Sequence, residues 1–151
     1  MSSSLRKFLV LDGRRRKFLL SAFFNLAHAH RALSRDSFKD LVAKLETNAG
    51  EPGRVSPMDD KGSIARDIGW AVRAAASRTP WESSCLVQVL AAQRMLQARG
   101  IGGVFYIGAA IGESPAEPGF AAHAWMMCDG EFITGEAGHE RDTVISEFSW
   151  E

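Results

Sequence analysis

The spacing of the apolar residues changes once along this chain, near Gly102-Gly103, and that change limits the folds that the chain can adopt. Before this point, apolar side chains recur at helical spacing, which predicts helices over residues 14–33, 37–45, 64–76 and 85–99. After it, apolar runs at 104–111 and 120–127 predict strands, and Asp129-Gly130 predicts a tight hairpin that returns through Glu131–Thr134. Helices followed by an antiparallel sheet indicate an α+β fold, in which a central helix bearing Cys85 packs on the sheet.

Length and charge restrict the domain organisation and the partners. The 151 residues suit one compact domain, in which a loop-like stretch separates an N-terminal helical part, residues 1–50, from a core, residues 51–151. Lysine plus arginine and aspartate plus glutamate number 18 each, so no net charge favours nucleic acid. Basic residues crowd the first quarter of the chain, where we expect either a solvated helix face or a surface for a partner.

The N-terminal region also bears on localisation. Arg14–Lys17 precedes the apolar run Phe18–Leu26, an arrangement that loosely resembles a secretory signal. It lies far from the N-terminus, however, and the run is shorter than the roughly 20 apolar residues of a membrane span. Cys85 and Cys128 do not make a disulfide framework, and we expect both to be free thiols in a reducing compartment. These features predict a cytoplasmic protein without stable membrane insertion.

Cys85 is the strongest candidate for a nucleophile. It follows Ser83-Ser84, either of which can cap a helix, and is therefore expected in the first turn of a helix that stops at Gly100. A helix N-terminus favours the thiolate, and its free N–H groups can form part of an oxyanion hole. The common alternative is a cysteine that acts as a small buried hydrophobe. Cys128 lies on a strand next to a turn and lacks such an environment.

Four histidines could supply the base. His28 and His30 are two residues apart on a helix, which is not the spacing of a metal-binding pair, and His139 lies in a polar tail. His123 stands in an otherwise apolar strand. A core histidine bonded to the backbone is the alternative, but opposite a thiol on a helix a general base is the better interpretation.

The register of the hairpin predicts a third residue. A two-residue loop at Asp129-Gly130 makes paired positions sum to 259, so that His123 lies directly opposite Glu136. Directly opposed residues have Cβ atoms about 5 Å apart, close enough for a carboxylate to hold an imidazole N–H. Asp129, the rival acid, is roughly 20 Å away along the strand. Glu136 is therefore predicted to orient His123, and the same alternation places Cys128 on the opposite face.

These pieces together resemble the transglutaminase-like core of lasso-peptide leader peptidases, which belong to the papain-like thiol hydrolases. The resemblance covers about Trp81–Glu136 and is carried by Ser84-Cys85-Leu86, Arg99-Gly100-Ile101, Ile107-Gly108, Ala122-His123-Ala124-Trp125 and Asp129-Gly130. It implies that Cys85 is the nucleophile and His123 the general base. The family's third residue is usually an aspartate about a dozen positions after the histidine, where this chain has Gly135-Glu136.

The resemblance implies a cysteine peptidase that removes the leader from a precursor peptide, usually just after a threonine at the penultimate leader position, without a metal or organic cofactor. A separate synthetase resembling asparagine synthetase would then close the macrolactam. A PqqD-like domain would capture the leader, and since this chain leaves no residues for one, we expect a separate recognition protein. Two alternatives stay open: another transglutaminase-like acyl transferase or amidase, and a non-catalytic peptide-binding module on the same fold.

Overall fold

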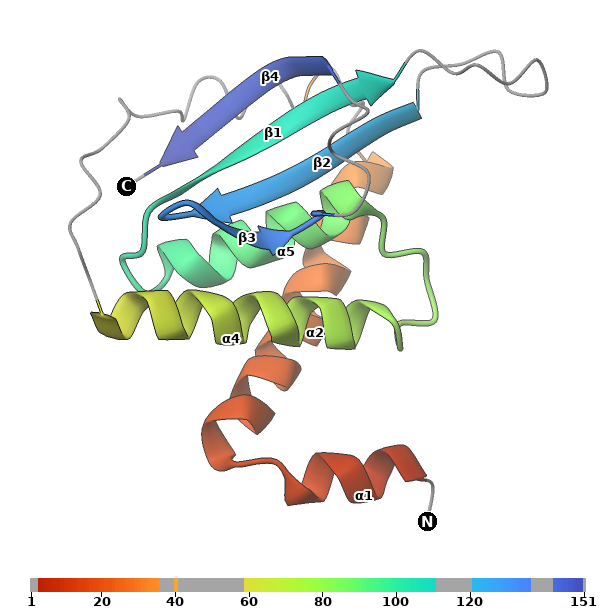
Figure 1. Cartoon of the computed structure of the whole chain (residues 1–151). Coiled ribbons are helices and arrows are strands. Elements are labelled where there is room, and N and C mark those ends of the chain that lie inside the picture. Colours follow the sequence, from red (N-terminus) through yellow and green to blue (C-terminus); the bar gives the residue numbers. More distant parts are fainter. Residues whose placement is uncertain (1–2, 36–39, 41–58, 111–120, 137–142, 151) are drawn as a thin grey trace.

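The computed structural model describes residues 3–35, 40, 59–110, 121–136 and 143–150, which form a layer of helices on one face of an antiparallel sheet (Figure 1). This is the α+β fold that the sequence predicts. The helices are α1 (Ser3–Val10), α2 (Gly13–Arg35), α4 (Asp59–Ala76) and α5 (Cys85–Gln97), and the strands are β1 (Gly103–Ala110), β2 (Ala121–Cys128), β3 (Glu131–Thr134) and β4 (Thr143–Trp150). The helix expected over 37–45, apart from Asp40, and the seam expected at residue 50 lie outside the described residues.

The sheet has the strand order β3-β2-β1-β4, with all neighbours antiparallel. The hairpin between β2 and β3 turns at Asp129 and Gly130, whose φ angles of 49° and 78° are both positive, as a two-residue turn of this kind requires. Cys128 pairs with Glu131 across this turn, as predicted. β2 therefore has β1 on one side and the short β3 on the other.

One hydrophobic core joins the helices to the sheet. The apolar stripe predicted for α2 is buried, at Phe18, Ala22, Leu26 and Ala29, and packs against α4 and α5. α5 lies on the inner face of the sheet against β1, β2 and β3 (Figure 1). α5 is thus fixed from both sides, which holds its first residue at a set position relative to β2.

Two elements were not expected from the sequence. α1 buries none of its side chains and projects away from the sheet at the far end of α2 (Figure 1). β4 pairs with β1, not with the strand preceding it, and buries Phe148 and Trp150 in the core, where Phe148 stacks on Phe105 with ring centroids 4.9 Å apart. None of the described helices is both long and apolar enough to cross a membrane.

Candidate active site

Cys85 is the first residue of α5, as predicted. Ser84 is the N-cap: its φ and ψ of −61° and 167° are extended, and its hydroxyl accepts a hydrogen bond from the backbone N–H of Val87 at 3.4 Å. Ser83, the other predicted cap, lies within hydrogen-bond distance of the Thr79 hydroxyl at 2.8 Å. The Cys85 thiol therefore lies at the positive end of the helix dipole, where negative charge on sulfur is stabilised.

The Cys85 thiol also contacts strand β2. The last pair that β2 forms with β3 is Met126 with Thr134, and beyond that pair the Ala124 N–H donates to Cys85 Sγ at 3.4 Å. A backbone donor directed at sulfur favours negative charge there, as the helix terminus does. The Cys85 side chain is a free thiol and only partly buried. Negative charge on its sulfur is favoured by both the helix terminus and the Ala124 N–H, and a substrate can reach the sulfur from solvent.

The His123 ring is held at one nitrogen and on one face. Its Nε2 lies 2.8 Å from the carbonyl oxygen of Gly135, and the ring stacks on Trp125 with centroids 5.8 Å apart and 27° between the planes. Because a carbonyl can only accept, Nε2 carries the proton in this hydrogen bond. In the neutral ring, Nδ1 is then the nitrogen with the lone pair, which is the form that a general base needs.

Cys85 Sγ accepts from the backbone N–H of the residue that follows His123, so the thiol lies against β2 at the position next to the histidine in the chain. A direct hydrogen bond between Sγ and the imidazole is not among those that the described residues make. Catalytic hydrogen bonds are often long without substrate and shorten in the reacting complex. The candidate nucleophile thus contacts the backbone next to the candidate base, and the hydrogen bond to Gly135 fixes the tautomer of the neutral ring.

The register predicted for Glu136 does not hold. After Met127 the pairing of β2 with β3 shifts by one residue, so that Met126 pairs with Thr134, one residue later than predicted. A bulge of this kind inserts an extra residue into one strand. The pairing that would set Glu136 directly opposite His123 is therefore wrong. Glu136 is exposed and next in the chain to the carbonyl that His123 binds, and its role as a third catalytic residue stays a prediction.

Cys128 lies in an environment that suppresses reactivity. Strand alternation places it on the face covered by helices, whereas His123 shares the other face with Trp125. Burial, and to a smaller extent the Asp129 carboxylate, raise the pKa of the Cys128 thiol to about 12. The thiol therefore stays protonated near neutral pH. Asp129, the rival acid for His123, belongs to the hairpin turn at the far end of β2.

His28 and His30, both on α2, contact α5 and the segment that precedes it. His28 Nε2 lies 2.9 Å from the Arg94 guanidinium on α5, and His30 stacks on Trp81 with centroids 5.9 Å apart. His139 lies outside the described residues. Within the described ranges no group of three or more His, Cys, Asp or Glu side chains could hold a metal ion.

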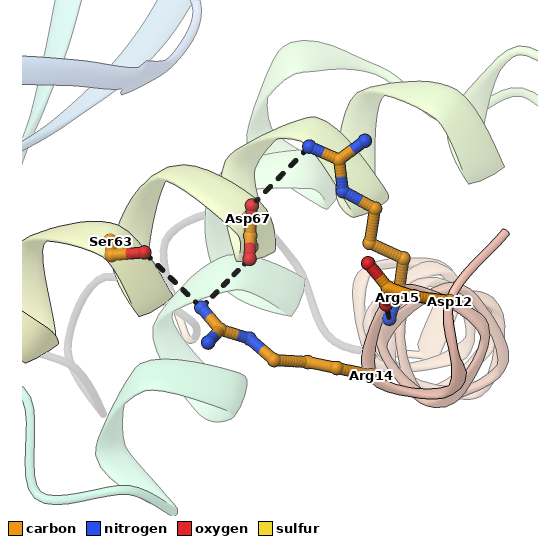
Figure 2. Close-up of polar contacts among 5 residues, drawn as sticks. All are labelled: Asp12, Arg14, Arg15, Ser63 and Asp67. Carbon is orange, nitrogen blue, oxygen red and sulfur yellow. Dashed lines mark hydrogen bonds and ion pairs between the residues drawn. The ribbon is translucent and has the colours of Figure 1, made fainter.

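Part of the basic N-terminal stretch has a structural task. Figure 2 shows Arg14 and Arg15, at the start of α2, reaching the Asp67 carboxylate on α4, at 2.7 and 3.9 Å. Arg14 also donates to the Ser63 hydroxyl at 3.4 Å, and the Asp12 carboxylate accepts from the backbone N–H of Arg15 at 2.8 Å (Figure 2). These contacts fasten α2 to α4, so the two arginines are not simply a solvated face.

Two backbone groups of the site were not predicted from the sequence. Ala124 and Gly135 contribute an N–H and a carbonyl, and an amino-acid sequence shows only side chains. One signal was present: Gly135 follows a strand and has a φ of 76°, a conformation for which glycine is the usual residue. A glycine directly before the predicted acid indicated an irregular backbone at the position where a regular register was assumed.

Comparison with known proteins agrees with the fold. A family model of the transglutaminase-like superfamily matches residues 25–147, from within α2 to within β4. No curated protein and no solved structure matches the chain significantly. The match covers most of the chain and includes the start of α5 and all of β2, and the protein therefore belongs to the transglutaminase-like superfamily.

Proposed function

We propose that this member of the transglutaminase-like superfamily is a cysteine peptidase that removes the leader from a lasso-peptide precursor in the cytoplasm. The observation that carries the proposal is the hydrogen bond from the Ala124 N–H to Cys85 Sγ, which holds a thiol at a helix N-terminus against the backbone of the residue after His123. The substrate class rests on the ordered motifs around Cys85 and His123 that resemble leader peptidases.

The proposed reaction is acyl transfer to sulfur and then to water. Cys85 Sγ attacks the scissile carbonyl carbon while its proton passes to His123 Nδ1, and N–H groups at the start of α5 stabilise the oxyanion. The tetrahedral intermediate collapses, His123 gives the proton to the departing amine of the core peptide, and the leader stays on sulfur as a thioester. Water, deprotonated by His123, then releases the leader carboxylate and restores the thiol. For the group that orients His123, Glu136 and the Gly135 carbonyl are rivals.

A separate PqqD-like recognition protein would present the leader, and we expect it to dock on α1 and the neighbouring part of α2. Exposed apolar side chains lie on these two helices, among them Leu5, Leu9, Val10, Leu20 and Phe24, with exposed fractions of 47–86%. Arg6 and Lys7 lie among them, also exposed. Apolar side chains rimmed by polar ones are typical of protein–protein contact surfaces. The freed core peptide would then pass to the macrolactam synthetase.

The test of the reaction uses a lasso-peptide precursor and intact-mass analysis. We expect leader and core fragments whose masses sum to the precursor plus one water. Cys85→Ala should abolish them and Cys128→Ala should leave most of them. Transfer of the leader to an added primary amine, with little hydrolysis, would favour an acyl transferase, and intact precursor after prolonged incubation would favour a binding module.

The test of the docking surface measures the acceleration that the recognition protein gives, through its local concentration of the substrate. Leu9→Ser with Phe24→Ser should lose that acceleration and keep the slow cleavage by the chain alone. Val144→Ser, which removes an apolar side chain of 49% exposure on β4, is the matched control and should keep both. Equal acceleration in all variants would place the partner elsewhere.

A further inference from the structure

We propose that the backbone carbonyl of Gly135, held in place from α4 by Arg73, is the group that orients His123. This assignment deepens the proposed function, because it rests on His123 as the general base. The Gly135 carbonyl oxygen then has the orienting role that the sequence predicts for the Glu136 carboxylate. Arg73 becomes a positioning residue that acts through the backbone.

The geometry around His123 supports the carbonyl. Its 2.8 Å hydrogen bond to Nε2 satisfies the donor of the ring, and stacking on Trp125 limits the rotation of the ring about its own axis. The tautomer that this bond selects leaves the Nδ1 lone pair to receive the Cys85 proton. The carbonyl therefore does what an orienting acid does in a catalytic triad, apart from supplying a full negative charge.

The position of the Gly135 carbonyl follows from the glycine itself. Its φ is 76°, and a Cβ at this residue would lie 2.8 Å from Trp125 Cα and closer still to the Ala124 carbonyl oxygen. The backbone at Gly135 thus lies directly against β2, one step along from His123, and any side chain there would push the two segments apart. Absence of a side chain is what lets the carbonyl come within hydrogen-bond distance of the ring.

Helix α4 holds the same segment from the other side. The Arg73 guanidinium donates to the Ile133 carbonyl, two residues before Gly135, and Ile133 is 1% exposed. A Cβ on Gly69, one helical turn earlier, would lie 2.9 Å from Ile133 Cγ2, so α4 and β3 are in close contact at this point. Arg73 satisfies a backbone acceptor that the bulge in β3 takes out of the regular ladder. The end of β3 is therefore clamped between α4 and β2, and the clamp sets the direction of the Gly135 carbonyl.

A neutral acceptor has a chemical consequence. A carboxylate stabilises the imidazolium formed during catalysis by its charge, whereas a carbonyl stabilises it only by its dipole. The site then depends more on the groups that favour negative charge on Cys85 Sγ, namely the Ala124 N–H and the start of α5. Loss of the Glu136 charge should accordingly matter little.

The experiment measures the histidine ring nitrogens by long-range ¹H–¹⁵N NMR of the full-length chain, with His123→Gln to assign the signals of His123. We expect Nε2 protonated and Nδ1 unprotonated in the neutral ring of the wild type, and the same in Glu136→Gln. Arg73→Ala should mix the two tautomers. Arg66→Ala is the matched control, since Arg66 also makes a polar contact from α4 to β3, a 2.9 Å surface ion pair with Glu131, and it should change nothing.

Rates supply the second readout. A misplacement of about 1 Å costs roughly 100-fold, so Arg73→Ala should lower kcat by about that factor with little change in KM. Glu136→Gln should change kcat by less than about threefold, whereas loss of an orienting carboxylate costs about 10⁴-fold. Gly135→Ala should lose activity as well. If Gly135→Ala does not fold, Arg73→Ala still decides the test.

The outcomes separate this assignment from the proposed function. An Nδ1-protonated ring in the wild type, or a larger effect in Glu136→Gln than in Arg73→Ala on the tautomer, would overturn the assignment. If the tautomers are as expected but the chain cleaves no precursor, the proposed peptidase function is rejected, and the orientation of His123 by Gly135 still holds.

Discussion

The two thiols of this protein should differ sharply in reactivity, because burial protects Cys128. The pKa of Cys128 is raised from 9.0 to about 12, three units, which lowers its thiolate fraction near neutral pH about 1,000-fold relative to an ordinary thiol. A thiolate of higher pKa is intrinsically more nucleophilic, by about 15- to 30-fold for three units. The net effect is alkylation roughly 30- to 60-fold slower than for an ordinary exposed thiol, before any hindrance by burial.

The assay is iodoacetamide labelling at pH 7.5, followed by intact-mass and peptide mapping. Wild type and Cys128→Ala should take up one label at the same rate, on the peptide that contains Cys85, while Cys85→Ala should stay almost unlabelled over the same time. Urea should make Cys128 react at the ordinary rate, which checks that folding causes the protection. Equal labelling of both cysteines in the native protein would refute the placement of Cys128 in the core and the distinction between the two thiols.

Three further results follow from the same structure. The folded state keeps the Cys128 thiol protonated, while the unfolded thiol ionises above pH 9, so the free energy of unfolding should fall as pH rises from 9 towards 12. By pH 10 the wild type should lose about 1.4 kcal/mol more of this free energy than Cys128→Ala, as measured by urea denaturation. Ser84→Ala should cost about 1 kcal/mol through loss of the α5 cap, and an unchanged unfolding midpoint would contradict that role. Phe105→Ala should cost about 3–5 kcal/mol, since Phe105 is fully buried, and a loss below about 1 kcal/mol would show that the core differs from the one described.

The elements that carry the site could be predicted because their signals are local. Helical spacing and two serines place Cys85 at a helix start, and a glycine in the second turn position marks the hairpin after β2. The predicted helix over 64–76 begins earlier, at Asp59 in α4, since polar residues at a helix start carry no periodicity. Local chemistry is sufficient for such elements, because their stability is decided within a few residues.

The predictions that were missing or wrong concern contacts between residues far apart in the sequence. β4 pairs with β1, about 40 residues earlier, although the alternation that ends in Phe148 and Trp150 is a local period-two signal of a strand. The register beyond Met127 is changed by a bulge at the place where α4 contacts β3, through Arg73. Extrapolating a hairpin register to Glu136 assumed a regular ladder, and tertiary contacts from a helix decide whether a ladder is regular.

The central claim is that Cys85 acts as a covalent nucleophile towards a leader peptide. The most direct measurement is rapid acid quenching of a reaction between the protein and its precursor, followed by intact-mass analysis and mapping of the adduct. We predict an adduct of the leader's mass, less one water, on the peptide that contains Cys85, sensitive to hydroxylamine and absent in Cys85→Ala. Cleavage that proceeds in Cys85→Ala, or a leader adduct on any other residue, would contradict the claim.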